Sequence, residues 1–244
     1  MQSNPKKIKK NFQKSIGNYS KNAVVQRVMA EKLVKAVGLN AFDSVLELGA
    51  GAGVLTEKIA TSFKYKRFYA NDLVEKSEFY VKKYIPNACF LGGDFRKINF
   101  KHNFDLIISN AVFQWFKNLD KIVEVCSGML VDGGVLAFST FSPDNFREFR
   151  EVSGLSLEYK SVDYIKKILE KNFEIISIES FEYKLQFDNP LKILAHMKST
   201  GVNSLNNKGW GIKEVRNFCD KYKLLYPDLT LTYVPIIVVC KRDN

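Results

Sequence analysis

The chain has little of what metal centres and redox sites require. Its four cysteines are spread among apolar neighbours without C-x-x-C spacing, at Cys89, Cys126, Cys219 and Cys240. Only two histidines are present, His102 and His196, a poor supply for a histidine-rich metal site or a Ser/His/Asp catalytic set. The sequence therefore predicts buried thiols and no bound metal.

Long apolar runs are also missing. The longest unbroken one near the C-terminus covers residues 234–240 and contains Pro235, whereas a membrane-spanning helix needs about 20 residues. The lysines near the N-terminus are not followed by the apolar stretch of a secretory signal. We therefore expect a cytoplasmic protein that does not cross a membrane.

Acidic residues are absent before Glu31, although the whole chain holds 37 basic and 26 acidic residues, a formal charge of +11. The basic side chains of this first segment are Lys6, Lys7, Lys9, Lys10, Lys14, Lys21 and Arg27. Such an arm favours an anionic partner, namely nucleic acid, a membrane surface or an acidic protein. A solvated arm that only aids solubility is an equally good interpretation.

The length of 244 residues, with 46% hydrophobic residues, fits one globular domain with an insertion. We expect a basic helical arm or lid at residues 1–38. A single domain would then cover residues 39–244, with a helical insertion at about 182–228.

Strand and helix patterns alternate along the middle of the chain, and strands such as residues 106–108 are apolar throughout. Continuous apolar strands are typical of a parallel sheet covered on both faces. The expected strands cover residues 44–48, 67–71, 88–91, 104–109, 135–141, 173–181 and 229–239. This pattern predicts an α/β fold with a doubly wound, mostly parallel seven-stranded sheet and an antiparallel last strand.

The first strand runs into a glycine turn, from Glu47 through Gly49, Gly51 and Gly53. Glycines allow the backbone to approach a ligand closely, and ligands of doubly wound sheets bind at the carboxyl end of this strand. A dinucleotide-binding turn needs glycine or alanine where this chain has Val54. A ligand without a pyrophosphate therefore fits better.

Polar residues follow the next strands: Asp72 the second, Asp94 the third and Asn110 the fourth. Asp72 is placed to accept hydrogen bonds from ribose hydroxyls, and Asp94 from an amino group such as that of adenine. Each residue alone could be a turn former or helix cap. Together, on one edge of the sheet, they predict a nucleoside site.

This set of motifs, over residues 40–141, resembles the class I S-adenosylmethionine methyltransferases. The resemblance implies S-adenosyl-L-methionine as cofactor and S-adenosylhomocysteine as product. It places the cofactor against Glu47, Gly49, Gly51, Gly53, Asp72, Leu73, Asp94, Phe95, Asn110 and Ala111.

A narrower resemblance, spread over most of the chain, is to the malonyl-acyl carrier protein O-methyltransferases of biotin synthesis. It rests on the N-terminal pattern around residues 12–26, the Gln114–Trp115 pair, and residues 139–141, 146–150, 197–203 and 231–233. It implies a malonyl thioester substrate on acyl carrier protein, an acidic partner for the basic arm. It also implies that Tyr19 and Gln26 position the cofactor. The residues after Asp72 and the segment around Phe149 depart from the family pattern.

A carboxylate already carries its nucleophilic charge, so methyl transfer to it needs alignment and no general base. Binding the free carboxylate calls for a planar cation, and Arg147, slightly ahead of Arg150, is the candidate. Three alternatives remain: a nucleic-acid methyltransferase, a small-molecule O-methyltransferase and a cofactor-binding module without activity. The first is disfavoured because residues 110–113 lack the N-P-P-Y/F run used to stack a flipped base.

Overall fold

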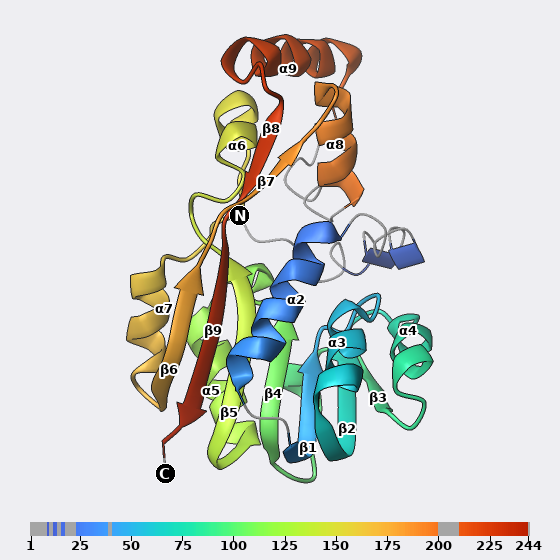
Figure 1. Ribbon diagram of the computed structural model, residues 1–244, viewed down its shortest axis with the longest axis vertical. Coiled ribbons are helices and arrows are strands. Elements are labelled where there is room, and N and C mark those ends of the chain that lie inside the picture. The colour runs from blue at the N-terminus through green and yellow to red at the C-terminus, as the bar shows by residue number, and fades with distance from the viewer. Residues whose placement is uncertain are drawn as a thin grey trace.

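The computed structural model describes residues 9, 12–13, 16–17, 23–38, 41–199 and 210–243. Seven strands form one sheet in the order β3-β2-β1-β4-β5-β9-β6 (Figure 1). Their bounds are β1 Ala41–Leu48, β2 Lys64–Asp72, β3 Cys89–Gly92, β4 Phe104–Asn110, β5 Leu130–Phe141, β6 Phe173–Ser180 and β9 Pro235–Arg242. Only β9 runs antiparallel to its neighbours, β5 and β6, which confirms the predicted fold class.

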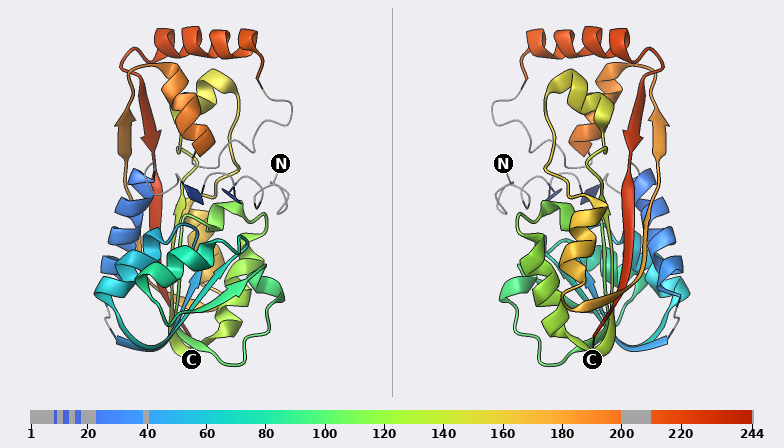
Figure 2. Two further views of the ribbon diagram at one scale, coloured as in Figure 1. Left: turned by 90° about the vertical axis from the view of Figure 1, so that its right-hand side faces the viewer. Right: turned by 90° about the vertical axis from the view of Figure 1, so that its left-hand side faces the viewer.

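Helices cover both faces of this sheet (Figure 2). One face packs against α2 Val24–Val37, α3 Val54–Ser62 and α4 Ser77–Tyr84, and the other against α5 Leu119–Met129 and α7 Val162–Leu169. Leu106 and Ile108 point to the first face and Ile107 to the second, and all three are fully buried. This burial explains why the strand is apolar at every position.

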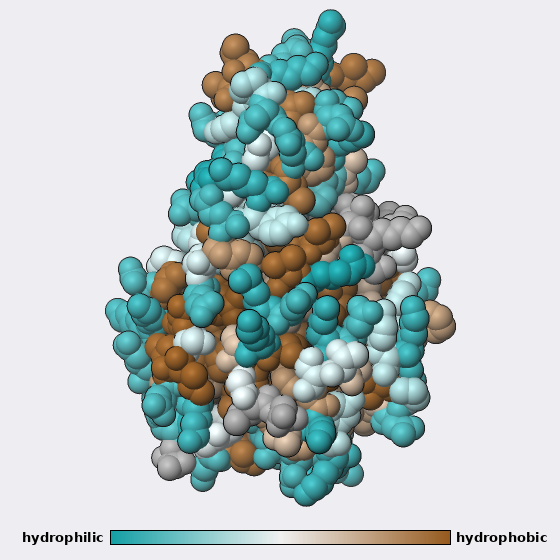
Figure 3. Space-filling model, viewed as in Figure 1, coloured by the Kyte–Doolittle hydropathy of each residue, from teal (hydrophilic) through white to brown (hydrophobic). Residues whose placement is uncertain are grey.

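A smaller unit, which we call the cap, stands above the carboxyl edge of the sheet (Figure 1). It consists of α6 Arg147–Ser153, β7 Tyr183–Gln186, α8 Pro190–Ser199, α9 Ile212–Leu225 and β8 Thr230–Tyr233. Strands β7 and β8 form a separate antiparallel pair. From the side shown in Figure 3, hydrophilic side chains cover most of the cap, with a few apolar ones over α9.

The cap differs in two ways from the helical insertion expected at 182–228. It contains the strand β7, whose signal is the alternation of Phe181, Tyr183, Leu185 and Phe187, which all pack against the core. The strand expected at 229–239 is also divided between β8 and β9, because the chain passes from the cap to the sheet at Val234. Among the described residues, no helix is long and apolar enough to span a membrane.

Candidate active site

A cavity of about 460 Å³ lies at the carboxyl edge of the sheet, and we call it the main cavity. The ends of β1, β2 and β4 and the turn after β3 supply much of its wall. Nine of the expected site residues line it: Gln26, Gly49, Gly51, Asp72, Leu73, Asp94, Phe95, Asn110 and Ala111. The sequence patterns therefore located residues that the fold brings together.

The glycine turn is tied to the end of β2. The backbone N–H groups of Gly49 and Ala50 donate to the Asn71 carbonyl at 2.8 and 3.0 Å. Gly49 has a φ of 72° and must remain glycine, because a Cβ there would lie 2.4 Å from a methyl carbon of Val112. Asn71 also lines the cavity. Sequence reasoning missed it, although it is a polar residue next to the end of a strand.

Asp72 holds the turn from the other side. Its Oδ2 accepts from the Gly51 N–H at 2.8 Å, and its Oδ1 accepts from the Val74 N–H at 2.7 Å. Burial raises the pKa of this carboxyl, while these backbone hydrogen bonds lower it. Each carboxylate oxygen can accept a second hydrogen bond, so Asp72 has the capacity to bind two ribose hydroxyls.

Asp94 is paired with an arginine that the sequence did not single out. The Arg96 guanidinium donates to both carboxylate oxygens, with 2.8 Å from Nε to Oδ1. This hydrogen bond lowers the pKa of Asp94. Arg96 also lies over the Phe116 ring at 5.6 Å, and all three side chains line the main cavity. Arg96 and Phe116 thus give this end of the main cavity a planar cation and a flat aromatic wall.

Asn110 uses its side chain to fix the end of β4. Its Oδ1 accepts from the Ser139 hydroxyl at 2.6 Å, and its Nδ2 donates to the Gln26 carbonyl at 3.0 Å. The next residue, Ala111, has a φ of 56°, a strained conformation that often marks functional sites. Both the oxygen and the nitrogen of the Asn110 side-chain amide are thus hydrogen-bonded within the protein. Its contact with the cofactor remains a prediction.

Two of the expected cofactor residues, Glu47 and Gly53, do not line the main cavity. Glu47 lies buried below the turn, where its Oε2 accepts from the Thr56 hydroxyl at 2.7 Å. Burial raises its pKa from 4.5 to about 8, and the neighbouring Asp72 adds to the rise. Gly53, with a φ of 75°, packs so closely on α4 that a Cβ would lie 3.1 Å from the Tyr80 carbonyl. Both residues support the turn from below.

The described part of the N-terminal arm reaches the main cavity. Lys9 and Phe12 line it, and Phe12 meets Trp115 edge to face at 6.1 Å. Tyr19 lies outside the described residues, as do five of the seven basic residues of the first segment. The lid function of the arm therefore stays a prediction, with three of its residues, Lys9, Phe12 and Gln26, in the cavity wall.

A narrow space of about 20 Å³ adjoins the main cavity, and we call it the aromatic recess. The two share Phe12, Gln26, Ala111 and Trp115. The rest of the recess is lined by Gln114, Phe141, Phe146, Leu157, Tyr159 and Tyr233. It lies where β5, β8 and the segment around α6 meet, so it joins the cofactor side of the site to the cap.

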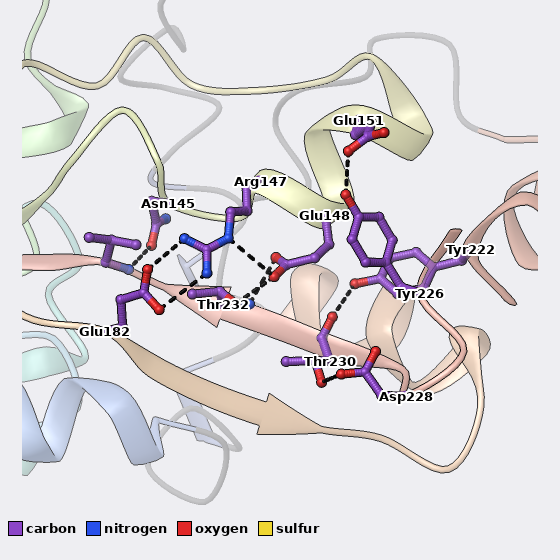
Figure 4. A network of polar contacts seen from close by, with 11 residues as sticks. Asn145, Arg147, Glu148, Glu151, Glu182, Tyr222, Tyr226, Asp228, Thr230 and Thr232 are labelled. Atoms are coloured by element: carbon purple, nitrogen blue, oxygen red, sulfur yellow. Dashed lines mark hydrogen bonds and ion pairs between the residues drawn. The ribbon is translucent and has the colours of Figure 1, made fainter. Parts of the chain in front are cut away.

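Neither of the two expected arginines lines the main cavity or the recess. Arg147 donates to both carboxylate oxygens of Glu182, at 2.6 and 3.1 Å, and lies 3.6 Å from Glu148 (Figure 4). Arg150 donates to the Pro143 carbonyl and has no acidic partner among the described residues. Arg147 thus already has carboxylate partners and Arg150 has none that is described, and which of them binds the substrate stays a prediction.

Comparison with known proteins agrees with this geometry. Residues 46–138 match a family model described as a methyltransferase domain. The malonyl-[acyl-carrier protein] O-methyltransferase of Chlorobium luteolum is 33% identical, covering 96% of this chain and 94% of its own. The protein of that name from Calditerrivibrio nitroreducens is also 33% identical, covering 97% and 96%.

Solved structures show the same fold. The N-methyltransferase NodS from Bradyrhizobium japonicum, in complex with S-adenosylhomocysteine, superposes with a TM-score of 0.57 at 13% identity. The match covers 97% of this chain and 99% of NodS. With nearly full-length relatives at 33% identity, this chain belongs to the malonyl-[acyl-carrier protein] O-methyltransferase family.

Proposed function

We propose that the protein transfers a methyl group from S-adenosyl-L-methionine to the free carboxylate of a malonyl thioester on acyl carrier protein. The product is the malonyl methyl ester, which serves biotin synthesis. The observation that carries this proposal is the shared wall between the main cavity, with Asp72 and Asp94 at its strand ends, and the aromatic recess. The nearly full-length similarity to the named relatives supports it.

The residues of the main cavity fit the cofactor. Asp72 has acceptor capacity for the ribose hydroxyls, the backbone at Gly51 leaves room for a close approach, and Asp94 would accept from the adenine amino group. When bound, S-adenosyl-L-methionine supplies a methyl group on a positively charged sulfonium. The aromatic walls made by Phe12 and Trp115 would shield this centre from water.

The protein needs to align the substrate carboxylate rather than to activate it. Holding two reactants in attack geometry contributes up to roughly 7–11 kcal/mol, and the carboxylate is ionised at neutral pH. Arg150 is the candidate for binding it, since its guanidinium has donors that no described carboxylate occupies. The basic arm would steer the acidic carrier protein toward the site.

The deciding experiment incubates the protein with methyl-labelled S-adenosyl-L-methionine and, in separate reactions, malonyl-carrier protein, malonyl-coenzyme A, free malonate and RNA. Label on the malonyl thioesters is expected. Label on RNA alone would contradict the proposal, and label on free malonate alone would favour a small-molecule enzyme. Raising the salt concentration should slow the carrier-protein reaction more than the coenzyme A reaction, because salt screens long-range steering; equal responses would remove the steering role of the arm.

A further inference from the structure

Tyr159 is a hydroxyl-bearing side chain of the aromatic recess that has no role in the proposed function so far described. It follows α6 in the chain and lines the recess, where its ring meets Phe141 edge to face at 6.1 Å. Phe141 ends β5, so the position of Tyr159 is fixed against the sheet rather than by the cap alone.

The direction of the hydrogen bond at this hydroxyl can be read from its partner, Asn145. The Oδ1 of Asn145 accepts from the Val234 N–H at 3.0 Å, which identifies the other amide atom as the nitrogen. That nitrogen lies 3.0 Å from the Tyr159 oxygen. Because an amide nitrogen can only donate, the Tyr159 oxygen accepts, and its own proton remains available. Among the described residues, no acceptor takes that proton.

The charge near Tyr159 is positive. Burial raises the pKa of the Tyr159 hydroxyl, while the Asn145 amide and the positive charge of Arg150 lower it by less. The phenol therefore keeps its proton at neutral pH. A protonated hydroxyl beside an arginine that no described carboxylate neutralises is a suitable environment for an anion.

Two amide oxygens of the recess cannot act as donors. The Oε1 atoms of Gln26 and Gln114 are buried with no hydrogen-bond partner among the described residues, and oxygen acceptors repel a carboxylate. The Gln114 amide is oriented by its Nε2, which donates to the Ala111 carbonyl at 2.6 Å. At Tyr233 the direction of the bond to His196 depends on the imidazole tautomer. Of the two tyrosines that line the described recess, Tyr159 is therefore the one whose hydrogen bond leaves the hydroxyl proton available.

We propose that the Tyr159 hydroxyl donates a hydrogen bond to the substrate carboxylate, at the oxygen that does not attack the methyl group. This bond would orient the carboxylate together with Arg150, and it would make the enzyme prefer a malonyl group over an uncharged acyl group. The inference rests on the proposed function, because it assumes a thioester with a free carboxylate.

The test compares the wild type with Tyr159→Phe, using methyl transfer to malonyl-coenzyme A. A hydrogen bond to a charged group of this kind predicts a rise in KM of about 10- to 100-fold. Affinity for S-adenosylhomocysteine should stay within about twofold, because the main cavity is unchanged. Tyr164→Phe is the matched control: its hydroxyl bonds Asp120 on α5 at 2.7 Å, and it should leave KM unchanged.

A second measurement concerns selectivity. Acetyl-coenzyme A lacks the carboxylate, so as a competitive inhibitor it should bind the wild type and Tyr159→Phe equally, whereas malonyl-coenzyme A should lose its advantage in the variant. If phenylalanine prevents folding, Tyr159→Met gives the same comparison with a more adaptable side chain. A wild-type KM in a folded variant would overturn the inference; no transfer to malonyl thioesters by the wild type would overturn the proposed function instead.

Discussion

The main cavity and the aromatic recess share a wall but are built in different ways. The main cavity is formed by consecutive strand ends, and much of its polar lining is backbone or is held by backbone, as in the bonds of Asp72 to Gly51 and Val74. The recess is lined by residues from the arm, from the ends of β4 and β5 and the turn after β4, from the segment around α6, and from β8. The cofactor side of the site thus follows from the fold, whereas the substrate side depends on distant segments meeting.

The two regions also handle charge differently. In the main cavity each acid has partners: Asp72 accepts two backbone hydrogen bonds and Asp94 is paired with Arg96. Next to the recess, Arg150 has no described acidic partner, and Tyr159 keeps a free proton. A substrate carboxylate would meet a complementary charge next to the recess.

The largest expected effect concerns Glu47, below the main cavity. The folded state holds its proton up to about pH 8, whereas the ordinary pKa is 4.5. The folded state therefore binds more protons between these values, so its stability should fall as the pH rises through this window. At about 1.4 kcal/mol per pKa unit the loss is about 5 kcal/mol at most.

Denaturant unfolding at pH 5, 6, 7 and 8 measures this loss, and Glu47→Gln should remove most of it. The amide keeps an acceptor for the Thr56 hydroxyl but does not titrate. The same pH dependence in wild type and variant would show that Glu47 ionises normally. The buried side chain below the glycine turn would then be a charged carboxylate at neutral pH.

Next in size is the loss of cofactor affinity in Asp72→Ala. The change removes a carboxylate that orients the Gly51 and Val74 N–H groups, and charged hydrogen bonds of this type contribute about 1.5–3 kcal/mol each. Calorimetry with S-adenosylhomocysteine should show a loss of about 100-fold. Asp43→Ala is the control, because Asp43 is an exposed carboxylate paired with Lys66, and this variant should bind S-adenosylhomocysteine as the wild type does. If both variants bind it equally well, Asp72 is not part of the cofactor site.

The connection between α6 and β8 within the cap can be tested at Glu148. This buried carboxylate accepts from the N–H of Thr232 at 3.0 Å and from its hydroxyl (Figure 4). Glu148→Ala leaves the buried N–H without a partner, which should cost about 2 kcal/mol of unfolding free energy. Glu182→Ala, an exposed partner in the same network, should change little. If the two variants are equally stable, α6 is held against β8 mainly by apolar packing.

The smallest effect is expected at Gly53, where the turn meets α3. A side chain there is strained by the φ of 75° and by the Tyr80 carbonyl, 3.1 Å from the added Cβ. Gly53→Ala should lower the unfolding free energy by about 1–2 kcal/mol. Gly128→Ala in α5, where a Cβ meets nothing within 4 Å, should be neutral or stabilising. Thermal unfolding of both variants checks the difference, and an equal response would mean that the turn is not strained.

Much of the sheet domain could be predicted because its signals are local. Apolar strands such as residues 106–108 and the glycine turn are recognisable over a few residues, so the strands, their direction and the cavity edge followed from the pattern. The sequence predicts Glu47 in the cavity because it adjoins the glycine turn. Strand alternation instead directs its side chain below that turn, toward Thr56. The sequence does not single out Arg96, because Asp94 is interpreted there only as a ligand-binding carboxylate and not as the partner of an arginine.

The sequence by itself determined the doubly wound sheet and the place of the nucleoside site, since these depend on periodicity and on residues at strand ends. The tertiary structure decided how α6 is held against β8 and which arginine is paired. Glu148 and Thr232 are 84 positions apart, and Asn145 and Val234 are 89. Contacts over such separations leave no periodic signal in the chain, so only the folded arrangement shows that Arg147 binds Glu182 and that Tyr159 retains a proton to donate.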